Sequence, residues 1–185
     1  MSSLCCCFRK ASEGDAGCEL ATKAPTVTLD RNGPAVVVSG GVVSGDGIAS
    51  ASTAIEQDAC YWEIHVVRAG SFRAGVGRSH SLAGDALAGP LGDGQSSWAL
   101  ASDDADLSDG DVLGVAFTQA DLPNLSFYIN GELSEKGQVN VVRGEVCPAA
   151  SVSGDAKLRF VFDETQFKHE APRPHSALQI VQSLI

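Results

Sequence analysis

Hydrophobic and polar residues alternate at a spacing of two along much of the chain. The pattern is clearest in Cys60–Val67 and in Leu125–Asn130. In Cys60–Val67, one face carries Trp62, Ile64 and Val66, and the other carries Tyr61, Glu63, His65 and Val67. Successive side chains of a β-strand point to opposite faces of a sheet. Each of these two segments therefore predicts a strand with one face buried.

A second type of strand is indicated immediately before Leu125–Asn130. Asp111–Phe117 is apolar and rich in β-branched residues, which is typical of a strand buried on both faces. The pair Asn130-Gly131 favours a type I′ hairpin turn, which requires positive φ at both central residues. We expect Phe117 and Phe127 to lie in the core.

The rest of the chain also consists of short apolar segments separated by Gly, Pro and Asn turns. Roughly ten to twelve strands and no helical periodicity before Gln166 predict an all-β fold, an antiparallel β-sandwich or barrel. Ala177–Ile185 places its apolar residues at helical spacing, and we expect a terminal helix or strand docked on the domain. A partner-binding motif is the alternative there. The other strands are expected at Pro25–Asp30, Ala35–Val38, Phe72–Gly77, Ser97–Leu100, Val139–Val142, Val146–Val152 and Lys157–Asp163.

Composition and charge narrow the functional classes. The chain has 185 residues, 44% hydrophobic and 19% charged, which is ordinary for a soluble globular protein with one main domain. A net charge of −10 opposes nucleic-acid binding. No apolar run approaches the roughly 20 residues of a membrane span, and the N-terminus lacks the pattern of a secretory signal. We expect a cytoplasmic protein that is not secreted.

The chain divides into three parts. Residues 1–24 form a Cys-rich leader expected to be flexible, residues 25–168 form the domain, and residues 169–185 form a tail that packs on it. Cys60 and Cys147 lie in apolar strand-like segments and are interpreted as buried small hydrophobic residues.

The adjacent cysteines of the leader, Cys5, Cys6 and Cys7, lie beside Phe8 and two basic residues, which is typical of S-acylation. Myristoylation is excluded because it needs glycine where this chain has Ser2. The first ten residues carry +2, so the remaining 175 carry −12, and an anionic membrane would repel them. Any membrane association is therefore expected through lipidation alone. An unmodified, metal-sensitive or redox-sensitive cysteine tail is the alternative.

No catalytic or metal-binding pattern is found. The acidic segment Asp103–Asp111 lacks the glycine and the glutamate of a calcium loop at the required positions. Gly75-Val76-Gly77 lacks the third glycine of a dinucleotide loop, and the four histidines lack zinc-ligand spacing with cysteine. The sequence therefore predicts no enzyme, no cofactor, no metal and no small-molecule substrate.

Six segments, in this order and spacing, resemble the SPRY domain family: YWEIHVV, FRAGVGRS, GDGQSSWAL, GDVLGVAF, LSFYINGE and VCPAASV. The resemblance covers about Thr26 to Phe167. Cys147 departs from it, because an aromatic residue is usual before the proline, as does Ala99, where glycine often follows the tryptophan. The resemblance implies a bent antiparallel β-sandwich without catalytic activity, which binds a partner protein or short peptide through loops at one end.

Two loops are the candidate contact regions. The first is Leu82–Gly94, flanked by two arginines that could form charge-assisted hydrogen bonds, and the second is Gln119–Asn124. The candidate partner-binding residues are Arg73, Arg78, Asp85, Leu87, Leu91, Asp93, Asp121 and Leu122.

Two other functions remain open. One is a stoichiometric structural subunit of a large assembly, such as a cytoskeletal or ciliary one, in which neighbouring subunits would order the leader and tail. A weaker one is a substrate adaptor for ubiquitin ligation, which is disfavoured because no RING, tripartite or suppressor-box segment accompanies the domain in this sequence.

Overall fold

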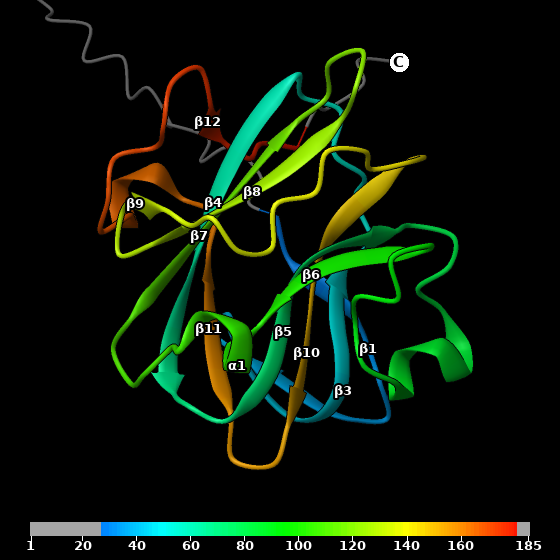
Figure 1. The fold of residues 1–185 in the computed structure, drawn as a ribbon. Helices are drawn as coiled ribbons and strands as arrows, with labels where there is room; N and C mark the ends of the chain where they lie inside the picture. Colours follow the sequence, from blue (N-terminus) through cyan, green and yellow to red (C-terminus); the bar gives the residue numbers. More distant parts are fainter. Residues whose placement is uncertain (1–26, 181–185) are drawn as a thin grey trace, which may run out of the picture.

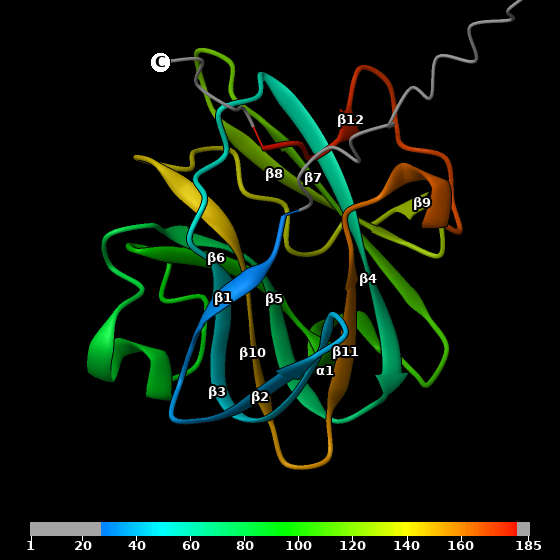
Figure 2. The ribbon, with the colours of Figure 1, turned by 180° about the vertical axis from the view of Figure 1, so that it is seen from behind.

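The computed structural model describes residues 27–180 of the protein. Predictions for the Cys-rich leader, including Cys5, Cys6 and Cys7, and for residues 181–185 lie outside the described residues. Within them, twelve strands form a continuous, strongly curled sheet that folds into a bent β-sandwich (Figures 1 and 2). The all-β prediction is confirmed.

The strand order is β6-β5-β10-β3-β11-β4-β7-β8-β9, with β1 and β2 beside β3 and β12 beside β4. All neighbours are antiparallel except β12 and β4, which are parallel. The strands are β1 Leu29–Asn32, β2 Ala35–Ser39, β3 Val42–Ala51, β4 Ala59–Arg68, β5 Ser71–Arg78, β6 Ser97–Ala101, β7 Val112–Thr118, β8 Asn124–Ile129, β9 Glu132–Leu133, β10 Val146–Ser153, β11 Lys157–Val161 and β12 Ser176–Ala177. The helical elements among the described residues are η1 Gly84–Ala88, α1 Ser102–Ala105 and η2 Glu164–Gln166.

Strand β3 joins the two layers of the sandwich. Its first residues, Val42 and Val43, pair with β11, and its later residues, from Gly47 to Ser50, pair with β10. Gly45 and Gly47 lie at this change of partner with φ of 101° and 125°. Only glycine adopts such angles without strain, so these two residues allow one strand to serve both layers.

The sequence predicted the core correctly. Phe117 and Phe127 are 2% and 0% exposed, and the thiols Cys60 and Cys147 are fully buried. The hairpin turn after β8 is also confirmed, because Asn130 and Gly131 have φ of 51° and 86°.

Two predicted segments differ in the structure. Val139–Val142 is not a strand, because Val139 forms one isolated bridge with Leu125 and the Val142 amide donates to the Pro123 carbonyl instead of to a ladder. The second is the acidic segment Asp103–Asp111, which shows no helical periodicity but contains most of the helical turn α1, capped by Asp106 in the left-handed region.

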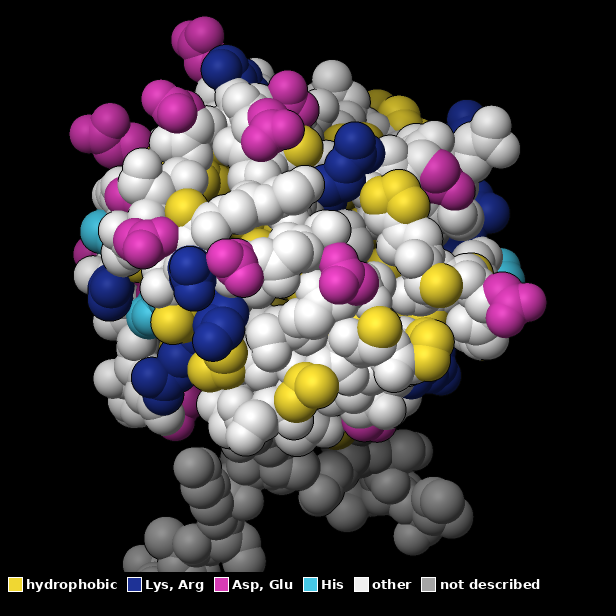
Figure 3. Space-filling view, turned by 90° about the horizontal axis from the view of Figure 1, so that it is seen from below, with side chains coloured by type: hydrophobic (Ala, Val, Ile, Leu, Met, Phe, Trp, Pro, Cys, Tyr) yellow, Lys and Arg dark blue, Asp and Glu magenta, His cyan; other side chains and the backbone are white. Residues whose placement is uncertain are grey.

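The loops of interest meet at one end of the sandwich, which we call the loop end. Strand register brings the end of β4 that contains Ala59 next to Thr118, and Arg78 next to Val146. The loops after β3, β5, β7 and β9 therefore lie close together, at the upper right of Figure 1. The opposite end is seen in Figure 3, where charged side chains of both signs surround hydrophobic ones.

The buried thiols predict a loss of stability at alkaline pH. Burial raises the pKa of Cys60 to about 12 and that of Cys147 to about 11. A thiol of the unfolded chain ionises near pH 8.5, so above that pH the unfolded state has released protons that the folded state still holds, and unfolding becomes easier. We expect the free energy of unfolding, measured with urea under reducing conditions, to fall between about pH 8.5 and 11.

The variant Cys60→Ala/Cys147→Ala separates this effect from the titration of other groups. Its free energy of unfolding should be lower than that of the wild type at neutral pH, but it should fall less steeply with rising pH. Equal pH slopes for the two proteins would show that the buried thiols contribute nothing to the alkaline loss.

Candidate functional site

The loop end carries two grooves separated by a ridge. One groove, of about 410 Å³, is lined by Ala54–Glu56, Phe117, Gln119, Pro123 and Gly144–Val146. The other, of about 480 Å³, is lined by Arg78, Gly94, Gln95, Trp98, Val141 and Arg143. The segment between Val141 and Val146 contributes to both grooves, so it forms the ridge between them.

Main-chain hydrogen bonds hold the ridge in place. The Val142 amide donates to the Pro123 carbonyl at 2.7 Å, and the Ser79 amide donates to the Glu145 carbonyl at 3.1 Å. On the other side, the Ile55 amide donates to the Val146 carbonyl at 2.8 Å. These hydrogen bonds connect the loops after β3, β5, β7 and β9 to one another, so the grooves are preformed.

Arg78 is the central cation of the second groove. Its guanidinium lies 5.8 Å from the centre of the Trp98 ring, within cation–π range, and its Nε donates to the Arg143 carbonyl at 2.8 Å. These contacts fix the guanidinium plane, while the half-buried side chain keeps donors at the surface. Arg143, which is exposed, adds a second positive charge to this groove.

The two grooves differ in charge, and each has an exposed hydrophobic side chain in or beside its lining: Val141 lines the second groove, and Leu122 precedes Pro123 of the first. Glu56 and Glu145 are the charged residues of the first groove, whereas arginines are those of the second. Leu122 is 64% exposed and Val141 is 41% exposed, two of the large hydrophobic side chains that the described residues leave in water. Asp121, the other candidate in this loop, is exposed beside Leu122.

The long loop before β6 behaves differently from the expectation for a free binding loop. Leu87 and Leu91 are 7% and 0% exposed, because they pack in the core, and the Leu91 amide donates to the Ser151 Oγ at 3.0 Å. Leu82 of the same loop is also buried, and Gly77 leaves room for it, since a Cβ at Gly77 would lie 2.6 Å from the Leu82 side chain. Leu87 and Leu91 are therefore not surface residues, and we remove both from the proposed contacts.

Asp93 organises the same loop from within. Its carboxylate accepts hydrogen bonds from the amides of Gln95, Ser96 and Ser97 at 2.8–3.0 Å. Hydrogen bonds, led by that of the Ser96 hydroxyl, hold the pKa of Asp93 well below its usual range. The carboxylate is committed to the turn that places Trp98 at the start of β6.

Arg73 and Asp85 do not join the loop end. Arg73 lines a separate groove of about 240 Å³, and its Nη1 donates to the Leu91 carbonyl at 3.4 Å. Asp85 is exposed on η1, the green coil at the lower right of Figure 1, and η1 packs against the turn between β1 and β2, where a Gly33 Cβ would meet the Leu87 carbonyl. Of the eight candidate residues, the structure brings Arg78, Asp121 and Leu122 to the loop end.

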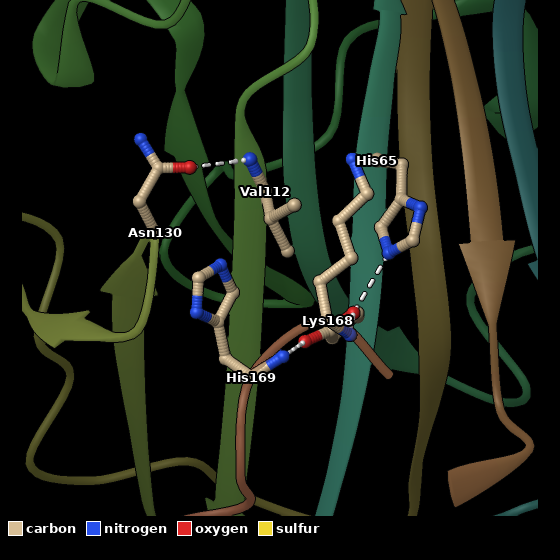
Figure 4. A network of polar contacts seen from close by, with 6 residues as sticks. His65, Val112, Asn130, Lys168 and His169 are labelled. Atoms are coloured by element: carbon tan, nitrogen blue, oxygen red, sulfur yellow. Dashed lines mark hydrogen bonds and ion pairs between the residues drawn. The ribbon is translucent and has the colours of Figure 1, made fainter. Parts of the chain in front are cut away.

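A buried carboxylate that the sequence analysis did not single out lies on β4. Glu63 is 0% exposed and accepts hydrogen bonds from the His65 ring at 2.7 Å and from the Lys168 and His169 amides at 2.8 Å each (Figure 4). Burial, and then the nearby Glu63 charge, raise the pKa of Tyr61. This network attaches the segment after η2 to the outer face of β4.

The alternation in β4 placed Glu63 on the outward face, but the sequence contains no signal for its burial. The groups that cover it lie 105 and 106 residues further along the chain. Among residues 27–180, no group of three His, Cys, Asp or Glu side chains has the arrangement of a metal site, and no helix is long and apolar enough to span a membrane.

Replacing Glu63 should destabilise the fold strongly. Glu63→Ala removes a fully buried carboxylate and leaves the Lys168 and His169 amides and the His65 ring without their acceptor, so we expect a loss of about 3 kcal/mol or more in the free energy of unfolding. Trypsin should also cut faster after Lys168. The control Glu132→Ala, at an exposed position in β9, should change stability by about 0.5 kcal/mol or less. Comparable losses for both variants would contradict a structural role of the Glu63 network.

Comparisons with known proteins address the fold. No protein-family model and no curated protein matches the sequence. Among solved structures, a human SPRY domain matches with a TM-score of 0.50 and 16% identity, over 69% of this chain and 94% of that one. The SPRY domain of human HERC1 matches with a TM-score of 0.51 and 17% identity, over 73% and 96%. The protein thus has the bent β-sandwich fold of SPRY domains, as the sequence motifs predicted.

Proposed function

We propose that the protein is a non-catalytic protein-interaction module that binds a partner protein or short peptide at its loop end. The observation that carries this proposal is the pair of preformed grooves on either side of the ridge 141–146, with exposed Val141 lining one groove and exposed Leu122 next to Pro123 of the other. Exposed hydrophobic side chains beside a fixed arginine–tryptophan pair are typical of protein-binding surfaces.

The fold supports this proposal by analogy only, because one fold can serve many functions. The stronger support is physical. Loops carried by a rigid sandwich hold their side chains in position before binding, which lowers the entropy lost on association. We propose Arg78, Asp121 and Leu122 as contacts, and we add Val141 and Arg143, which the sequence analysis did not select.

The proposal predicts that partner binding depends on Leu122 far more than on Leu133, although both leucines are similarly exposed. Leu122→Asp should weaken capture of the partner by about tenfold or more, because a charge would replace an apolar contact. The matched control is Leu133→Asp, since Leu133 is 55% exposed but lies at the other end of β8, opposite Tyr128. The measurement is quantitative affinity capture from native lysate, followed by binding of the isolated partner to both variants.

Binding at the loop end would be contradicted if Leu122→Asp and Leu133→Asp both abolished capture of the partner, or if neither weakened it. Loss only when residues 1–24 or 169–185 are removed would favour the alternative of a structural subunit held in an assembly through its termini. Catalytic turnover of the captured partner would contradict a pure interaction module.

We further propose that S-acylation of Cys5, Cys6 and Cys7 attaches this module to membranes. Stable anchoring needs two signals, such as two acyl chains, because a single chain binds only marginally. Acyl-exchange labelling of the full chain from its native cells should fall by most of its intensity in the triple variant Cys5→Ser/Cys6→Ser/Cys7→Ser. Equal labelling of wild type and variant would rule out acylation at these positions.

A further inference from the structure

Several basic side chains gather on one side of the domain, with acidic side chains beside them. The whole chain carries −10, yet four of its basic residues, Arg68, Lys157, Arg159 and Lys168, lie on one side of the molecule. Figure 3 shows Lys and Arg side chains gathered at the left, the side on which β4 and β11 lie in Figure 1, with histidine and hydrophobic side chains among them.

The register of β4 and β11 places one pair of like charges, Lys157 and Arg68, directly opposite each other. Lys157 pairs with Arg68, and Arg159 pairs with His65. Leu158 and Phe160, which alternate with the two basic residues of β11, are 0% and 6% exposed, so Lys157 and Arg159 point outward. Opposed like charges cost stability in a sheet, so the Lys157–Arg68 pair favours an anion near this face.

The Glu63 network adds Lys168 to this face. The Lys168 amide is bonded to the buried Glu63 carboxylate, and Figure 4 shows the Lys168 side chain running along β4 beside His65. The Glu63 charge is fully buried. Arg68 is paired with Asp155 at 3.1 Å, but both side chains are more than half exposed, so this pair neutralises the face weakly.

Exposed valines flank the basic residues on the same outer face. Arg159 is paired with Val42 of β3, and Val42 is paired with Ser39 of β2, so Val37, two residues earlier, also points outward. Val37 is 61% exposed, and Val67, two residues after His65 in β4, is 49% exposed. The face is therefore a sheet surface that combines positive charges with small apolar side chains.

We propose that this surface, which we call the basic face, docks the domain on an anionic membrane. Each Lys or Arg near an anionic leaflet contributes about 1 kcal/mol, and apolar side chains beside them can enter the interface. An acidic peptide would be favoured by a groove, and the described grooves at the loop end do not include these residues. The exposed valines on an open sheet face favour a lipid surface instead.

The basic face is independent of the proposed partner site. It is built on the second half of β4, from His65 onward, whereas the loop end begins at Ala59, so about 20 Å of strand separates the two. A membrane-docked domain could therefore keep its loop end free. The net charge of the chain predicts repulsion by an anionic leaflet, and the basic face is a local exception to that repulsion.

The test is vesicle flotation of the full chain produced without acylation. The vesicles are phosphatidylcholine alone, or with about one-third phosphatidylserine. We expect at least tenfold stronger binding to the anionic vesicles at low salt, decreasing as salt is added. Arg159→Glu should reduce this binding about 20-fold, since it removes one positive charge and adds a negative one. The matched control Lys136→Glu, which is exposed near α1, should change it less than about threefold.

The apolar contribution is tested separately. Val37→Ser/Val67→Ser should weaken binding to anionic vesicles without changing its salt dependence, and thermal unfolding verifies that each variant is folded. Equal binding of wild type to both vesicle types, or equal losses for Arg159→Glu and Lys136→Glu, would overturn the proposal. Binding of soluble polyglutamate at the basic face without binding to anionic vesicles would also overturn it and would indicate an acidic protein partner.

Discussion

The buried Glu63 carboxylate is the constraint on which the arrangement of the outer sheet face depends. Trp62 and Ile64 point into the core, so Glu63 must point outward, where it would meet water. A carboxylate removed from water requires hydrogen-bond donors, and the His65 ring and the amides of Lys168 and His169 supply them. The chain after η2 is thus held across β4.

This attachment decides which part of the outer face remains exposed. Phe167, adjacent to the bonded amides, lies edge-on against Tyr61 with ring centres 5.3 Å apart, and Ala177 of β12 pairs with Tyr61. The half of β4 near the loop end is thereby covered. The other half, with Val67 and Arg68, stays open and forms part of the basic face.

Local pattern predicted the strands well and the non-local contacts poorly. Alternation of residue types identified β4 and β8, although β4 is buried on both faces from Cys60 to Ile64. Asn130-Gly131 identified its turn because few other residues tolerate positive φ. Val139–Val142 was mistaken for a strand because its apolar residues match the pattern, although the Val142 amide bonds to a loop carbonyl.

The sequence could place the candidate residues only in part, because their surroundings depend on non-local contacts. Loop length and resemblance selected Arg78 and Leu122, which lie at the loop end. They could not show that Leu91 would be buried beneath its own loop, or that Glu63 would be covered by residues more than a hundred positions away. The sequence also could not predict that basic residues of β4 and β11 lie side by side, because this arrangement arises from strand pairing and not from neighbours in sequence.

The central claim is that the loop end, and no other exposed apolar site of the domain, contacts the protein partner. Hydroxyl-radical footprinting of the protein, free and in its native complex, tests this claim most directly because it reports the solvent exposure of individual side chains. The account predicts protection of Leu122 and Val141 in the complex, with Leu133 unchanged. Protection of Leu133 with Leu122 and Val141 still fully reactive would contradict it.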